Sequence, residues 1–160
     1  MLNSFKSVHA EYPSVKLKIA GDGPEKSKFV NWCLENSMED AIVFCGMLNE
    51  PDLVSFYRSL DVYVHATKSE TMSTSVMQAA ACGLPILASD ITGMKEMLDE
   101  SFMRLSNPGD VTMLNHHMIE LLSSQDLRLD MGASARQHAL IRFSHKTMFN
   151  SYIELVPSSQ

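Results

Sequence analysis

The stretch from Ser69 to Pro85, SETMSTSVMQAAACGLP, places an acid and an amide on either side of a run of hydroxyl residues. Glu70 comes before the hydroxyl run that starts at Ser73, and Gln78 follows the acid by eight positions. A helix that begins near Ser73 presents free backbone N–H groups and a positive dipole end to whatever lies in front of it. Such an end suits a diphosphate, and Glu70, just outside the helix, suits the hydroxyls of a sugar.

Gln78 has two interpretations. On the first turns of this helix, its carboxamide could reach the edge of the same ligand. However, Ser75 and Gln78 also have the spacing of a capping box, in which Gln78 would only satisfy a backbone N–H group. Spacing alone leaves both interpretations open.

Further glycines and small polar residues stand where apolar runs end. These segments are Gly21–Gly23, Gly46–Leu48, Thr67–Ser73 and Ser89–Gly93. In an open parallel sheet, ligands bind outside the carboxyl ends of the strands, so we expect these segments to face one cleft. Lys26 occupies the position of the third glycine in the dinucleotide-binding fingerprint, which excludes a typical dehydrogenase, and no Gly-Lys-Ser/Thr phosphate loop is present.

The apolar runs predict an α/β fold. We expect strands within 15–23, 41–46, 61–66 and 85–89, separated by helices that begin near Pro24, Pro51 and Ser73, and then helices over 110–123, 126–142 and 145–155. Strands that are apolar on both faces and alternate with helices indicate a parallel sheet covered on each side. The prediction is one Rossmann-like, three-layer α/β/α domain over residues 1–160, with extra helices at the C-terminus.

The first residues predict a helix without a preceding strand. Leu2, Phe5 and Val8 recur at helical spacing directly after Met1. A doubly wound domain usually opens with a strand, so we expect this chain to begin one strand late.

The composition narrows the class of partner. Thirteen Lys and Arg against 19 Asp and Glu give a net charge of -6, which argues against nucleic acid as a partner. The three cysteines form no Cys-x-x-Cys pair, so we predict neither a disulfide framework nor a metal site: Cys33, Cys45 and Cys82. The absence of a signal peptide and of a run of about 20 apolar residues leads us to expect a cytoplasmic protein.

Taken in order, these motifs resemble a known family. The run IAGDGP … IVFCGML … DVYVHATKSETMSTSVMQAAACGLPILASDITGMKEML is similar to the C-terminal domain of retaining, nucleotide-sugar-dependent glycosyltransferases of the GT-B fold. This group includes glycogen synthases, phosphatidylinositol mannosyltransferases and many bacterial capsule and lipopolysaccharide transferases. Its hallmark is Glu-x7-Glu followed by Ala-Met-Ala-x-Gly-x-Pro, which Glu70 and the segment Ala79–Pro85 match. The likeness continues through Gly132–Ser144.

The resemblance implies a role for each matched position. Glu70 would be the catalytic residue that holds hydroxyls of the donor sugar, and Gln78 would contact the ribose. Phosphates would lie against backbone amides near the start of the helix, and the base would lie against the loop after the second strand. The implied donor-binding set is Gly21, Gly46, Met47, Leu48, Met72, Ser73, Thr74 and Gln78.

Four positions need separate comment. The family's second acid is Gln78 here, and a carboxamide accepts with one end and donates with the other, whereas a carboxylate accepts from both ribose hydroxyls. Gly93 and Glu96 match the family's Gly-x-x-Glu, where Glu96 could be only a structural cap. His65, at a strand end, either touches ligand or packs inside.

The resemblance also implies what lies outside this chain. The family's diphosphate-binding basic residues and its acceptor-binding domain come before the helix that Met1 opens. We therefore expect this chain to be the donor half of an enzyme that builds a surface polysaccharide or glycolipid. The donor would be a UDP-, GDP- or ADP-sugar, and the enzyme would need no metal. An N-terminal domain or separate chain would complete it, with peripheral membrane association through that half; alone, this chain would transfer nothing. The alternatives are a non-catalytic nucleotide-binding or partner-subunit module and a flavodoxin-like or receiver-type domain.

Overall fold

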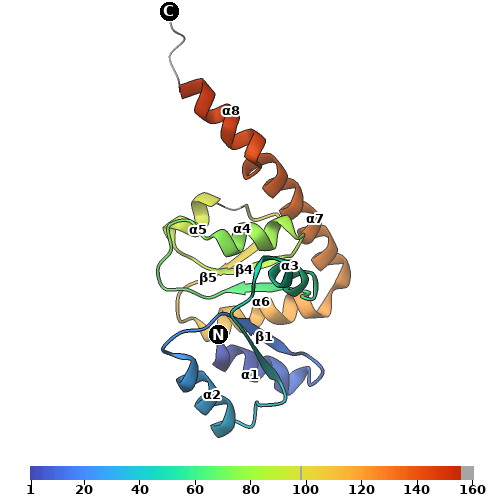
Figure 1. Cartoon of the computed structure of the whole chain (residues 1–160). Helices are drawn as coiled ribbons and strands as arrows, with labels where there is room; N and C mark the ends of the chain where they lie inside the picture. Colours follow the sequence, from blue (N-terminus) through green and yellow to red (C-terminus); the bar gives the residue numbers. More distant parts are fainter. Residues whose placement is uncertain (98, 156–160) are drawn as a thin grey trace, which may run out of the picture.

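The computed structural model describes residues 1–97 and 99–155 of the chain. Helices and strands alternate through most of it, and three helices follow the last strand (Figure 1). The elements in order are α1 (Leu2–Glu11), β1 (Leu17–Ala20), α2 (Lys26–Glu35), β2 (Ile42–Gly46), α3 (Glu50–Arg58), β3 (Tyr63–His65), α4 (Thr74–Ala81), β4 (Ile86–Ser89), α5 (Thr92–Met97), β5 (Met103–Ser106), α6 (Val111–Ser123), α7 (Gln125–Arg142) and α8 (His145–Leu155).

The strands form two parallel sheets, not the single sheet that the sequence predicts. Over the described residues, β1 pairs with β2, and β3, β4 and β5 pair in that order. Leu17 lies opposite Ile42 in the first sheet, and Tyr63 lies opposite Ile86 in the second. The four predicted strands are present, so the α/β class is confirmed, while the division into two sheets corrects the prediction.

The sequence analysis did not predict strand β5. Its four residues include Arg104, which interrupts the apolar run that a buried strand normally shows. In the structure, the guanidinium of Arg104 lies 3.3 Å from the carboxylate of Glu120 on α6. This ion pair lets a charged side chain occupy a strand beside the core.

The largest core surrounds β4. All four residues of β4 are buried, with α4 and α5 on one side of the sheet and α6 on the other (Figure 1). A second cluster joins α1 to the β1–β2 sheet through Phe5, Cys33 and Ile42. Both clusters use helix α1, because Val8 belongs to the larger one.

The helix that the site depends on has clear boundaries. Ser73 is the N-cap of α4, because its hydroxyl accepts a hydrogen bond from the amide of Val76 at 3.4 Å. Gly83 follows the other end with φ +78°, a conformation that favours glycine. Among the described residues, none of the helices is long and apolar enough to pass through a membrane.

Candidate functional site

Four of the predicted donor-binding residues line one cavity. This cavity has a volume of about 900 Å³ and includes Gly21, Met47, Leu48 and Gln78 in its wall. Gly46 directly precedes Met47 and adopts φ +65°, the left-handed turn that sends the chain out of β2. The glycine-rich ends of two strands and the first turns of α4 therefore meet at the same place, as the parallel-sheet rule predicts.

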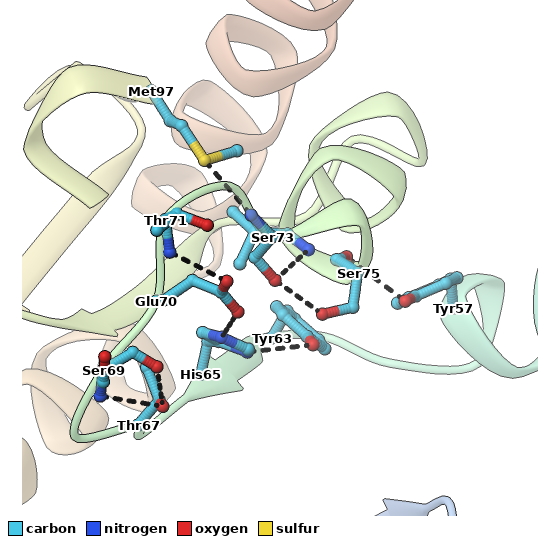
Figure 2. Close-up of polar contacts among 11 residues, drawn as sticks. Tyr57, Tyr63, His65, Thr67, Ser69, Glu70, Thr71, Ser73, Ser75 and Met97 are labelled. Carbon is cyan, nitrogen blue, oxygen red and sulfur yellow. Dashed lines mark hydrogen bonds and ion pairs between the residues drawn. The ribbon is translucent and has the colours of Figure 1, made fainter. Parts of the chain in front are cut away.

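Glu70 lies in the loop between β3 and α4, and two contacts hold its carboxylate (Figure 2). One oxygen accepts a hydrogen bond from the amide of Thr71 at 3.0 Å. The other lies 3.5 Å from Nε2 of His65, which also lines the cavity. The Glu70 side chain is 27% exposed, so it stays open to a ligand.

His65 is oriented from its other side by Tyr63. The Tyr63 hydroxyl lies 3.5 Å from Nδ1 of His65 (Figure 2). Burial raises the pKa of the Tyr63 phenol, so the hydroxyl keeps its proton and can donate to Nδ1. The other ring nitrogen of His65, Nε2, is buried and lies 3.5 Å from the carboxylate of Glu70. Tyr63, His65 and Glu70 thus form a chain of polar contacts that fixes the direction of the acid.

Gly93 brings helix α5 against the Glu70 loop. A Cβ atom at position 93 would overlap the carbonyl oxygen of Glu70 and would lie 2.6 Å from that of Thr71. Only glycine permits this close approach of two backbone segments. The family's Gly-x-x-Glu therefore has a steric reason at its first position, while the side chain of Glu96 lies outside the described part of the chain.

The N-terminus of α4 is partly engaged. Ser73 is 4% exposed, its hydroxyl lies 2.9 Å from that of Ser75, and its amide donates to the sulfur of Met97 at 3.4 Å. The Ser73 amide, predicted to be free for a phosphate, therefore already has an acceptor, although a thioether is a weak one. For the amides of Met72 and Thr74, we find no acceptor among residues 1–97 and 99–155.

Gln78 is not part of a capping box. The N-cap is Ser73, whereas the box requires Ser75 at that position. The carboxamide oxygen of Gln78 instead accepts from the hydroxyl of Tyr57 at 3.3 Å, and this hydroxyl also lies 3.2 Å from the carbonyl oxygen of Ser75. Gln78 is exposed on the cavity wall, so the structure removes the capping interpretation.

Sequence reasoning missed three residues that support the site. Tyr57 and Tyr63 occur in apolar runs, where an aromatic residue normally predicts core packing, and no spacing connects Met97 to Ser73. Burial raises the pKa of Tyr57 as well, so both phenols act as protonated donors. The only available signal was the hydroxyl of each tyrosine, which usually finds a partner when it is buried.

Comparison with known proteins places the chain in a family. Residues 1–138 match the family model described as "Glycosyl transferases group 1". The chain belongs to this family. Its group 1 relatives include the sulfoquinovosyl transferase of Arabidopsis thaliana, which is 32% identical over 140 residues, or 85% of this chain and 27% of the relative. An O-antigen biosynthesis glycosyltransferase of Escherichia coli is 26% identical over 84% of this chain and 36% of its own length.

Solved structures show the same fold. TarM of S. aureus, in a complex that contains UDP, superposes with a TM-score of 0.87 at 18% identity, over 97% of this chain and 31% of TarM. HepE of Anabaena, in complex with UDP and glucose, gives a TM-score of 0.87 at 18% identity, over 99% of this chain and 44% of HepE. These likenesses confirm the predicted GT-B fold class. The group 1 chain described here thus spans about a third of the length of the relatives it matches.

Proposed function

We propose that this chain binds a nucleoside-diphosphate sugar as the donor half of a retaining glycosyltransferase that builds a surface polysaccharide or glycolipid. The supporting observation is the placement of Glu70, which His65 and the Thr71 amide hold beside both the α4 N-terminus and the cavity lined by Met47, Leu48 and Gln78. The groups follow the order of the parts of such a donor. They are an acid for the sugar hydroxyls, amides for the phosphates and an apolar wall for the base.

In this proposal, the residues act on different parts of the donor. Glu70 accepts hydrogen bonds from sugar hydroxyls and orients the ring, which raises the rate through positioning. As the sugar–phosphate bond loosens towards an oxocarbenium-like state, the amides at the start of α4 stabilise the departing diphosphate. The acceptor site and the remaining positive charge come from an N-terminal domain or a separate chain, and the proposal includes no metal ion.

A thermal-shift screen of UDP-, GDP- and ADP-sugars against the 160-residue chain tests the proposal. A donor at about 100 times its Kd should stabilise the folded chain by about 2.7 kcal/mol and raise its Tm. The bound donor is then titrated by calorimetry. If none of the three classes binds, the proposal is wrong. If a nucleotide binds but the chain combined with the proposed N-terminal domain or separate chain transfers no sugar, the non-catalytic alternative is correct.

Gln78 offers a sharper test within the same cavity. Replacing Gln78 with alanine should weaken nucleoside diphosphate binding by about fivefold to tenfold, since one hydrogen bond to the ribose is lost. Gln78→Glu keeps an acceptor for the ribose and for Tyr57 and should change affinity by less than about tenfold. Calorimetry with UDP or GDP measures the affinity of both variants.

Tyr57→Phe provides the control for this pair. It removes the hydrogen bond to Gln78 without removing the carboxamide, so any loss it causes reports on orientation alone. Unchanged binding by Gln78→Ala would remove Gln78 from the proposed site.

A further inference from the structure

The amide of Ser73 faces a sulfur atom of the protein itself. It donates to Sδ of Met97 at 3.4 Å, and Ser73 is only 4% exposed. Met97 is the last residue of α5 and is buried in the same core cluster as Val76 of α4. Figure 2 shows the thioether beside the Ser73 amide, with Glu70 in the loop that leads to the same residue. The place in front of this amide is therefore occupied by a side chain.

A thioether is a poor partner for this position. The sulfur of methionine is a weak hydrogen-bond acceptor. The start of a helix carries a positive dipole end, which favours an anion. A phosphate oxygen would accept from the same amide as a charged group, and such bonds are about twice as strong as neutral ones. Exchange of the sulfur for a phosphate oxygen is therefore favourable for the Ser73 amide.

Two contacts hold the backbone of α5 in place. Gly93 packs directly against the carbonyl groups of Glu70 and Thr71. At the other end of the helix, the carbonyl oxygen of Met97 lies 3.1 Å from Nε2 of His138 on α7. The side chain of Met97, in contrast, is unbranched and has three rotatable bonds. It can leave the Ser73 amide while the backbone of α5 stays where it is.

The position of Ser73 indicates which phosphate its amide would meet. In the proposed function, Glu70 holds the sugar and Gln78 contacts the ribose. Ser73 lies between them in the chain, three residues after Glu70 and five before Gln78. Its amide is therefore closer to the sugar end of the donor, where the phosphate that carries the sugar would lie.

We propose that the thioether of Met97 competes with the diphosphate of the donor for the Ser73 amide, an inference that rests on the proposed function. In the unliganded chain, the sulfur accepts from this amide. When the donor binds, an oxygen of the sugar-bearing phosphate replaces the sulfur, and the Met97 side chain turns away. Because the sulfur contact stabilises only the unliganded state, it lowers the affinity for the donor.

Met97→Leu tests the proposal, because it removes the acceptor and keeps a similar side-chain volume. Calorimetry should show that UDP binds about threefold to tenfold more tightly, since the Ser73 amide loses its partner in the unliganded state only. UMP lacks the sugar-bearing phosphate and should bind within about twofold of its original affinity. GDP with GMP, or ADP with AMP, replaces this pair if the thermal-shift screen selects that base.

Met94→Leu is the matched control. Met94 lies in the same helix and the same core cluster as Met97, so this variant makes the same chemical change at a second buried position. It should leave the affinities for UDP and UMP unchanged. A gain in UDP affinity that appears in both variants would come from a loosened core, and it would contradict the proposal.

NMR on the unmodified chain gives a second readout that does not depend on the folding of a variant. The methionine methyl groups are labelled with carbon-13 and the amides with nitrogen-15. Addition of UDP should shift the Ser73 amide and the Met97 methyl resonances together, while the Met94 methyl resonance should move less and serves as the internal reference. If Met97→Leu does not fold, these resonances decide the question.

The failure of this inference differs from the failure of the proposed function. If the unmodified chain binds no nucleoside diphosphate, both are wrong. If UDP binds and Met97→Leu lowers its affinity or leaves it unchanged, Met97 only supports the loop and this inference alone is wrong. The same conclusion follows if Met97→Leu tightens UMP as much as UDP, or if bound UDP leaves the Ser73 and Met97 resonances in place.

Discussion

Replacing Glu70 with glutamine should weaken the binding of a nucleotide sugar by about 10- to 100-fold, while the free nucleoside diphosphate should bind within about twofold of its original affinity. The carboxylate accepts from sugar hydroxyls as a charged group, and such bonds are about twice as strong as neutral ones. The amide of glutamine keeps the shape but loses the charge. It also faces Nε2 of His65 with either an oxygen or an NH₂ group, so its orientation is less well fixed.

Calorimetry with the nucleotide sugar and with its nucleoside diphosphate measures this difference. Glu120→Gln is the matched control, because it removes an acid that pairs with Arg104 and lines neither described cavity. It should leave both affinities unchanged. An equal loss for sugar and diphosphate would show that Glu70 acts through the electrostatic field or the fold and not on the sugar. No loss for either would remove it from the sugar site.

The sequence predicted the strands whose apolar runs are continuous. Segments such as AIVFCG and PILAS contain no charged side chain, and both form strands. β5 was missed because Arg104 lies within it, and its partner Glu120 is 16 residues away in the sequence. The division into two sheets was not predictable either, because it depends on which edges find a neighbour in space.

The candidate site was predictable where it depends on backbone conformation and residue spacing. Glycine at strand ends, Ser73 as an N-cap and Glu70 before the helix follow from local rules. The supporting contacts do not, because the Tyr57 hydroxyl reaches Gln78 from 21 residues away and Met97 reaches Ser73 from 24. Only the folded chain brings these partners together, and a hydrophobic pattern does not distinguish a tyrosine that hydrogen-bonds another side chain from one that only packs.

Gly93 illustrates both the sequence motif and the fold. The motif predicts a glycine at this position, and the fold explains why only glycine fits there. Gly93→Ala should lower the free energy of unfolding by about 2–3 kcal/mol, because the new Cβ meets backbone carbonyl oxygens that cannot rotate away. The loop must move, and Glu70 moves with it. We therefore expect nucleotide-sugar affinity to fall by about tenfold or more, with a smaller loss for the diphosphate.

Gly132→Ala separates this positioning effect from a general loss of stability. A Cβ at position 132 would overlap the carbonyl oxygen of Gly83, which lies just beyond the far end of α4 from Glu70. Urea unfolding should show a similar destabilisation, while calorimetry, at a temperature where both variants are folded, should show nearly unchanged sugar affinity. If Gly132→Ala lowers sugar affinity as much as Gly93→Ala does, the loss comes from the weakened fold and Gly93 does not position Glu70. If only Gly93→Ala lowers it, the close approach of α5 to the loop is what holds the acid in place.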